Sequence, residues 1–179
     1  MTDTLSGKRV AFLATDGYED SELTSPWQAV TDAGATAVLV SPASGSIEGK
    51  NGHEQPVDLA SDAADAADFD ALVLPGGVVN ADHLRMDEAS VAFAKAFFAQ
   101  HKPVGAICHG PWTLVEADVV RGKTLTSWPS LHTDIVNAGG DWRDEEVFRC
   151  PMDPFVLVTS RKPDDIPAFS DALIKELSP

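Results

Sequence analysis

The chain contains few cysteines and few basic residues. Cys108 and Cys150 are the two cysteines among 179 residues, so a disulfide framework of the secreted kind is excluded and both thiols are expected to be free. Thirteen lysine and arginine residues stand against 28 acidic ones, which gives a formal net charge of −15. Such a surface repels phosphate backbones and anionic lipid headgroups, and we therefore expect neither a nucleic-acid partner nor a membrane partner.

Long hydrophobic runs are also missing. The first apolar run covers residues 10–14 and follows polar and acidic residues, so it is typical of neither a secretory signal nor a membrane span. With 44% apolar residues, a chain of this length is sufficient for one hydrophobic core. We predict a single domain over residues 1–179 and a cytoplasmic location.

The common nucleotide and metal motifs are absent as well. The sequence has no GxGxxG, GxxxxGK[ST], HExxH or HxH spacing. The loop TDGYEDSE, residues 15–22, carries four carboxylates, which would repel the phosphate of a flavin cofactor. We expect no cofactor and no metal.

The chain does contain an alternation of apolar segments and amphipathic segments. Predicted strands cover residues 8–14, 35–40, 71–77, 104–107, 124–128, 146–150 and 155–160, with a hairpin over 44–59. Predicted helices cover residues 21–34, 87–101, 110–118, 130–138 and 164–177, and residues 61–70 could form a short one. Because most strands are apolar without alternation, the pattern predicts an α/β fold whose mostly parallel sheet is covered by helices on both faces.

Three loops are expected to meet at one edge of this sheet. In open α/β sheets, ligands bind beyond the carboxyl ends of the strands. The loops TDGYED, PGG and CHG each follow a predicted strand, at residues 15–20, 75–77 and 108–110. The candidate site therefore lies where these three loops converge.

Cys108 is the candidate nucleophile. It follows a buried strand and precedes a helix, and the neighbouring Gly105 and Gly110 have no side chain to obstruct a sharp turn between the two. This arrangement is typical of a nucleophile elbow, and a thiol at a helix start can lose its proton more easily. The alternative is a small buried core residue, which is how we interpret Cys150.

Several residues could assist the thiol. Glu19 could hydrogen-bond the thiolate or relay a proton, although Asp16, Asp20 and Glu22 compete for that role. His109 reaches the sulfur only if the turn is unusual, because adjacent residues of a helix do not face each other.

Glycines in these loops could bind the substrate. Gly76 and Gly77 could present a backbone N–H group to a reacting carbonyl and, with the N–H group of His109, form an oxyanion hole. We place Gly110 in the same substrate-binding set. The simpler alternative is that the Gly76–Gly77 pair only forms a turn.

The loops together resemble a known family. DGYEDSELTSP, LVLPGG, PVGAICHGPW and VTSRKPDDIPAF are similar, in this order, to segments of the ThiJ/PfpI superfamily, in the branch of the PfpI endopeptidase and the bacterial YhbO-like stress proteins. The resemblance covers about residues 8–177. It implies a flavodoxin-like three-layer sandwich, as in class I glutamine amidotransferase domains.

The resemblance also implies roles for single residues. Cys108 would be the nucleophile, Glu19 would hydrogen-bond its sulfur, and His109 would be the histidine of a catalytic dyad. In PfpI a carboxylate from a neighbouring subunit completes the site, which points to a homo-oligomer, a dimer or a hexamer. Asp82 is the matching residue here, although the archaeal protease has a glutamate and one residue fewer before it.

Three functions compete at this stage. The preferred one is a glyoxalase-like or deglycase-like reaction, in which Cys108 adds to a small reactive aldehyde such as methylglyoxal and a hydroxy acid is released. The second is hydrolysis of a peptide by Cys108 and His109, with Asp82 supplied by a neighbour. The third is a non-enzymatic stress sensor or chaperone-like protein that is oxidised at Cys108.

Overall fold

A seven-stranded, mostly parallel sheet forms the centre of the molecule. The computed structural model describes residues 4–151 and 156–179. The strands lie in the order β10-β11-β7-β6-β1-β2-β5, and β10 is antiparallel to β11 whereas the other neighbouring pairs are parallel. The strands span Arg9–Leu13 (β1), Thr36–Ser41 (β2), Leu59–Ala60 (β5), Ala71–Leu74 (β6), Val104–Ile107 (β7), Val147–Cys150 (β10) and Leu157–Ser160 (β11).

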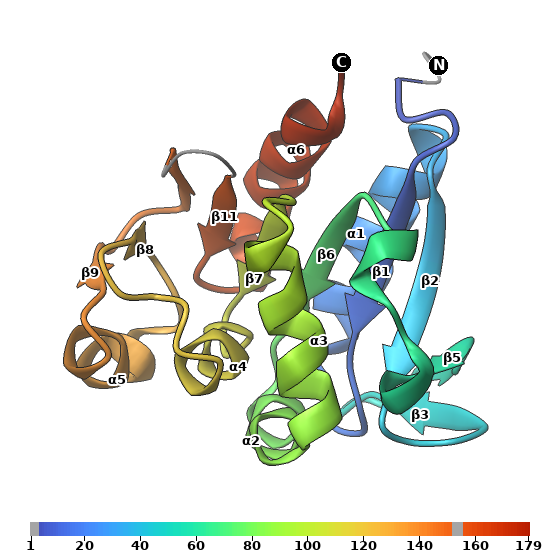
Figure 1. The fold of residues 1–179 in the computed structure, drawn as a ribbon, viewed down its shortest axis with the longest axis horizontal. Helices are drawn as coiled ribbons and strands as arrows, with labels where there is room; N and C mark the ends of the chain where they lie inside the picture. Colours follow the sequence, from blue (N-terminus) through green and yellow to red (C-terminus); the bar gives the residue numbers. More distant parts are fainter. Residues whose placement is uncertain (1–3, 152–155) are drawn as a thin grey trace.

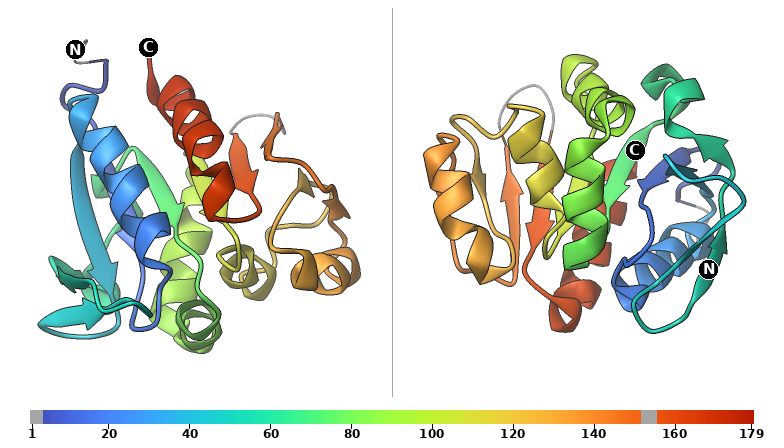
Figure 2. Two further views of the ribbon diagram at one scale, coloured as in Figure 1. Left: turned by 180° about the vertical axis from the view of Figure 1, so that it is seen from behind. Right: turned by 90° about the horizontal axis from the view of Figure 1, so that it is seen from below.

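Helices cover both faces of the sheet. Figure 1 shows α3 in front of the sheet, and Figure 2 shows α1 and α6 on the opposite face. The helices span Asp20–Asp32 (α1), Val78–Met86 (α2), Glu88–Ala99 (α3), Pro111–Glu116 (α4) and Ile166–Leu177 (α6). This three-layer arrangement confirms the predicted flavodoxin-like fold.

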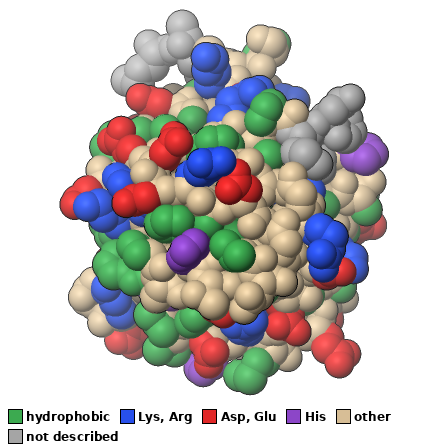
Figure 3. Space-filling model, turned by 90° about the vertical axis from the view of Figure 1, so that its left-hand side faces the viewer, with side chains coloured by type: hydrophobic (Ala, Val, Ile, Leu, Met, Phe, Trp, Pro, Cys, Tyr) green, Lys and Arg blue, Asp and Glu red, His purple; other side chains and the backbone are tan. Residues whose placement is uncertain are grey.

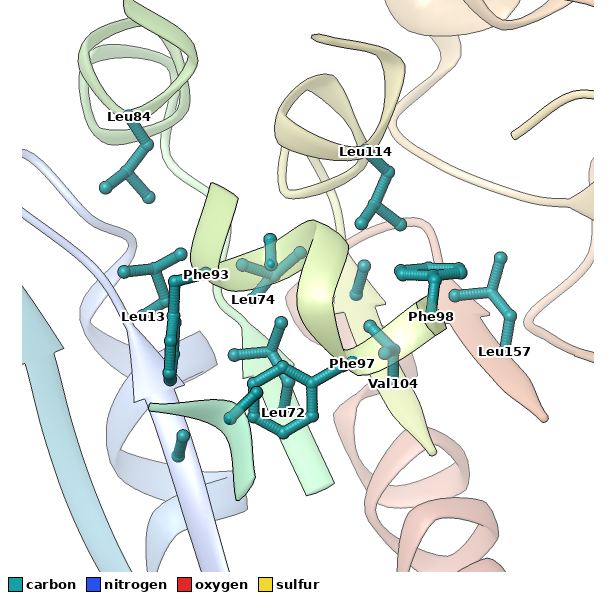
Figure 4. Packing of buried hydrophobic residues seen from close by; sticks show 14 of the residues in the cluster. Leu13, Leu72, Leu74, Leu84, Phe93, Phe97, Phe98, Val104, Leu114 and Leu157 are labelled. Carbon is teal, nitrogen blue, oxygen red and sulfur yellow. The ribbon is translucent and has the colours of Figure 1, made fainter. Parts of the chain in front are cut away.

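Each face of the sheet has its own hydrophobic core. In β6, Leu72 and Leu74 point into the cluster under α3, while Ala71 and Val73 point into the cluster under α1 and α6. Successive residues of a strand point to opposite faces, so an all-apolar strand is what two covered faces require. Figure 4 shows Leu72 and Leu74 packed against Phe93 and Phe97 of α3, with Leu84 and Leu114 pointing toward this cluster from two further helices.

Two separate two-stranded sheets lie outside the seven-stranded sheet. A hairpin of β3 (Ser46–Glu48) and β4 (Glu54–Pro56) follows β2. On the other side, β8 (Thr124–Leu125) pairs with β9 (Asp141–Trp142) near α5 (His132–Asn137). Short 3-10 turns complete the described elements, at Ser61–Ala63, Ala66–Asp68, Pro129–Leu131 and Pro163–Asp165.

Acidic residues do not gather on the face that carries α5 and β9. Figure 3 shows acidic, basic and hydrophobic side chains interspersed there. None of the helices in the described part of the chain is long and apolar enough to cross a bilayer.

Some predicted elements differ from the structure. Helix α2 was not predicted, because its buried positions are Asn80, Ala81 and Leu84, and the polar asparagine interrupts the apolar spacing. The predicted strand 124–128 is limited to Thr124–Leu125 and lies outside the main sheet. The predicted short helix over 61–70 is a pair of 3-10 turns. The first residue of the predicted strand 155–160 lies outside the described residues.

Candidate active site

A cavity of about 730 Å³ opens at the carboxyl edge of the sheet. The three predicted loops converge on it, so that Glu19, Gly77 and Cys108 line the same space. Figure 1 shows α2 and α4 at this end, toward which the parallel strands point. The lining residues are Gly17, Glu19, Lys50, Gly77, Val78, Val79, Cys108, His109, Trp112, Trp128, Ser130 and Pro163.

Cys108 lies in the turn between β7 and α4 in a strained conformation. Its φ angle is +61°, which is unfavourable for a residue with a side chain. The backbone is fixed on both sides: the Cys108 N–H group donates to the Ser160 carbonyl (3.0 Å), and the Trp128 N–H group donates to the Cys108 carbonyl (2.9 Å). These contacts to β11 and to the segment after β8 hold the thiol at the floor of the cavity.

His109 reaches the thiol despite being its neighbour in sequence. Its Nδ1 atom lies 3.2 Å from the Cys108 Sγ atom. The positive φ angle at Cys108 changes the direction of the chain, so the spacing rule for regular helices does not apply. The imidazole ring packs against Trp112 at 5.2 Å and Trp128 at 5.9 Å between centroids. Burial and the Lys50 charge lower the pKa of His109, so the ring is neutral at neutral pH.

The carboxyl group of Glu22 lies beside the thiol. This residue is fully buried in the first turn of α1. Its Oε2 atom accepts a hydrogen bond from the Gly76 N–H group (2.8 Å), and the side chain also contacts Cys108. The sulfur contact expected for Glu19 is therefore made by Glu22, which was among the alternatives.

Burial controls the protonation of this pair. It raises the pKa of Glu22 to about 8, and the Gly76 N–H group opposes the shift only in part. Glu22 is therefore protonated at neutral pH. Burial and a Glu22 carboxylate both raise the pKa of the Cys108 thiol, whereas the N–H groups of Gly77 and His109 lower it. When Glu22 is neutral, its charge no longer disfavours the thiolate. Its O–H group can then donate a hydrogen bond to the sulfur.

Glu19 lies at the mouth of the cavity. It forms an ion pair with Lys50, which extends from the turn between β3 and β4. The hydrogen bond to Glu19 raises the pKa of the Lys50 ammonium group. The two glutamates of the first loop thus have different environments, one a lysine pair and the other a buried contact with sulfur.

The three glycines differ in what their N–H groups can do. The Gly77 N–H group faces the thiol, whereas the Gly76 N–H group is used by Glu22 and the Gly110 N–H group donates to the Ile107 carbonyl (2.9 Å). A side chain at Gly110 would lie 2.4 Å from the Leu74 carbonyl, so close packing requires glycine there.

Asn80 fixes the glycine loop. This residue is fully buried, and its Nδ2 atom donates to the carbonyls of Pro75 (3.1 Å) and Gly76 (3.0 Å). Its Oδ1 atom accepts from the Thr15 N–H group (2.7 Å). One amide therefore holds the loops after β1 and β6 in register, with Gly76 and Gly77 placed toward Glu22 and Cys108.

Asp82 lies elsewhere on this chain. It is on α2 and lines a second surface cavity with Arg85 and Glu116, which form an ion pair of 3.4 Å. The contacts described for His109 do not include Asp82. Its role beside His109 stays a prediction that depends on a neighbouring subunit.

Sequence reasoning missed Lys50, Asn80 and the contribution of Trp112 and Trp128 to the cavity. Lys50 could have been found, since its hairpin follows the strand next to β1 and so lies at the same edge of the sheet.

The described residues hold no cluster of three potential metal ligands. Cys150 is buried, and its sulfur accepts a hydrogen bond from the Thr124 N–H group (3.4 Å).

Comparison with known families matches nearly the whole chain. Residues 8–176 match the model described as the DJ-1/PfpI family. The chain is 43% identical to the putative cysteine protease YraA of Bacillus subtilis, with 91% of this chain and 94% of that protein covered. It is 44% identical to general stress protein 18 of the same species, with 92% and 94% covered.

A further relative and a solved structure agree with these matches. Protein/nucleic acid deglycase 2 of Escherichia coli is 42% identical, with 95% of this chain and 98% of that protein covered. A two-domain protein of Anabaena variabilis, with DJ-1/ThiJ/PfpI-like and ferritin-like domains, superposes with a TM-score of 0.89 at 34% identity. That match covers 95% of this chain and 48% of the two-domain protein.

Proposed function

Because the chain belongs to the DJ-1/PfpI family, we propose that it converts small reactive aldehydes, or their adducts, to hydroxy acids through Cys108. The observation that carries this proposal is the placement of the Cys108 thiol between a buried, neutral Glu22 and the Nδ1 atom of His109, at the floor of a cavity. The relatives called deglycases support it.

In the first step, neutral His109 takes the proton of the Cys108 thiol, and the resulting thiolate attacks the aldehyde carbon of methylglyoxal. A carbon–sulfur bond forms, the carbonyl electron pair moves to oxygen, and that oxygen takes the proton of the Glu22 carboxyl group. The product is a hemithioacetal. A neutral carboxyl group beside the sulfur suits this step, because it can donate a proton where a carboxylate cannot.

In the second step, a base removes the hydrogen of the former aldehyde carbon as a proton. Glu22, now a carboxylate, acts as this base, while His109 keeps the thiol proton until the sulfur is released. A proton is returned to the adjacent carbon, which leaves a thioester. Water then cleaves the thioester, so that a hydroxy acid leaves and the thiol is restored. The sequence consumes one water molecule and needs no external oxidant.

Peptide hydrolysis is the second candidate. The 3.2 Å contact between His109 Nδ1 and Cys108 Sγ favours it, because a thiol and an imidazole at this distance form a nucleophile and base pair. An amide is a poorer electrophile than an aldehyde, and the base needs an orienting acid. Asp82 lines a different cavity of this chain, so this function requires an oligomer that brings the partner's acid to His109.

Replacement of Cys108 tests the proposal. We expect Cys108→Ala to reduce hydroxy-acid formation from methylglyoxal to the uncatalysed rate, measured by chromatography of the product. Equal consumption by wild type and variant would contradict the proposal. Release of peptides from casein by wild type alone would favour the peptidase, and gel filtration would show whether an oligomer exists. Peroxide-induced oxidation of Cys108 without either activity would favour the stress sensor.

A further inference from the structure

The turn between β3 and β4 is attached rigidly to the loop after β1. The Lys50 N–H group donates to the Tyr18 carbonyl (2.9 Å). The N–H groups of Asn51 and His53 both donate to the Asp20 carboxylate (3.0 and 2.9 Å). Gly52 has a φ angle of +94°, which glycine tolerates and which closes the turn.

Further contacts fix the same turn from its other side. The hydroxyl group of the buried Tyr18 donates to the His53 carbonyl (2.7 Å) and lies 2.8 Å from the His53 Nδ1 atom. The Gly17 N–H group donates to the Glu48 carbonyl (2.8 Å). The Lys50 backbone is therefore held in place, and its amine can move only by rotation of its own side chain.

Lys50 is the one cationic side chain among the described residues that line the cavity, and Glu19 is the one carboxylate. The walls are otherwise apolar or weakly polar, with Val78, Val79 and Trp128 partly exposed. An ammonium group has three N–H donors, so Lys50 can keep its bond to Glu19 and still donate to a second acceptor.

We propose that Lys50 binds a carboxylate group of the substrate, so that the cavity prefers small aldehydes bearing a carboxylate over neutral aldehydes of the same shape. The substrate class rests on the proposed function, whereas recognition of a carboxylate beside Cys108 does not. The formal charge of −15 repels anions from the surface in general, and a single cation at the cavity mouth gives them a local attraction. The apolar walls accept the remainder of such a molecule.

Alkylation of Cys108 tests the recognition without any enzymatic assay. Iodoacetate and iodoacetamide have nearly the same shape and react alike: the thiolate forms a carbon–sulfur bond and iodide leaves. They differ in that only iodoacetate carries a carboxylate. The readout is the ratio of the iodoacetate rate constant to the iodoacetamide rate constant, measured by mass spectrometry of Cys108, so changes in thiol reactivity cancel.

Three variants bracket the expected effect. Lys50→Met removes the charge and should lower the ratio about fivefold, as expected for one charge near the surface. Lys50→Arg keeps the charge and should retain the ratio. Glu19→Gln frees Lys50 from its partner and should raise the ratio. Added salt should reduce the wild-type ratio. A ratio that is the same in wild type and Lys50→Met would overturn the proposal.

A substrate pair separates this proposal from the proposed function. The measured quantity is kcat/KM for 4-carboxyphenylglyoxal divided by kcat/KM for phenylglyoxal. We expect Lys50→Met to lower this quotient. Turnover of both compounds with no change of the quotient in Lys50→Met would overturn the role of Lys50 in substrate choice and leave the proposed function intact. No turnover by wild type, together with a shifted alkylation ratio, would overturn the proposed function and support anion recognition by Lys50.

Discussion

The floor and the mouth of the cavity each contain a glutamate, and the two differ in nearly every respect. Glu22 is fully buried and has a pKa raised to about 8, so it carries a proton at neutral pH. Glu19 precedes it by three residues and forms an ion pair with Lys50. Residue type therefore does not decide which carboxyl group can donate a proton to the sulfur. Burial and the available partner decide it.

Replacing each glutamate by glutamine gives the largest expected contrast. Glutamine cannot release a proton, so Glu22→Gln should lower kcat for methylglyoxal about 100-fold, as expected on loss of a general acid and base. Glu19→Gln should lower kcat less than about threefold, because Glu19 is paired with Lys50 at the mouth of the cavity. Steady-state kinetics on both variants measures this. Equal losses of kcat in the two variants would contradict the different roles assigned to Glu22 at the floor and Glu19 at the mouth of the cavity.

Thiol reactivity above neutral pH provides a sharper contrast. In wild type, Glu22 loses its proton near pH 8 and its charge then raises the pKa of Cys108. Glu22→Gln cannot acquire this charge, so at about pH 9 iodoacetamide should alkylate its thiol about tenfold faster than in wild type. At about pH 6.5 the two rates should agree, since Glu22 is then neutral. Glu19→Gln keeps the Glu22 carboxyl group, so its rate should also fall behind that of Glu22→Gln above neutral pH, and the fall should begin at a lower pH than in wild type because the Glu19 charge raises the pKa of Glu22. Parallel profiles for wild type and Glu22→Gln would contradict the assignment.

The free energy of unfolding should show a related but smaller effect. The pKa of Glu22 is about 8 in the folded state, against an ordinary value of 4.5 for a glutamate side chain, so between these values the folded state binds the extra proton. Stability contributed by Glu22 is then present at low pH and falls as pH rises, by about 1.4 kcal/mol per pH unit. Urea unfolding from about pH 5 to 8 measures the slope.

Glu22→Gln should reduce that slope, whereas Glu19→Gln should retain most of it, because burial is the largest cause of the raised Glu22 pKa and the Glu19 charge is a smaller one. The difference between wild type and Glu22→Gln isolates this group, because other titrating residues contribute equally to both. Identical slopes would show that Glu22 is ionised in the folded protein.

The sequence was sufficient for the arrangement of the sheet and for the meeting of three loops. Uninterrupted apolar strands such as β6 determine that both faces are covered, and parallel strands bring their carboxyl ends to one edge. The position of Cys108 followed from the strand and helix around it. These features depend on local patterns that one chain displays directly.

The details of the site depend on packing between distant segments. Whether Glu19 or Glu22 points to the sulfur is decided by the rotation of α1 about its axis, which the spacing of apolar residues does not fix within one or two positions. Asn80 is buried because its amide satisfies three backbone groups from two loops, an arrangement that hydrophobic patterning cannot reveal. The place of Lys50 depends on the contacts of Tyr18 and Asp20 with its turn.

The φ angle of +61° at Cys108 means that this position opposes the stability of the fold. A glycine would occupy the same backbone without strain, whereas any other side chain costs about 1–3 kcal/mol in such a conformation. That cost is a sizeable part of the roughly 5–15 kcal/mol that stabilises an ordinary domain. Selection for stability alone would favour glycine here, so the cysteine is a residue that the proposed reaction requires and the fold does not.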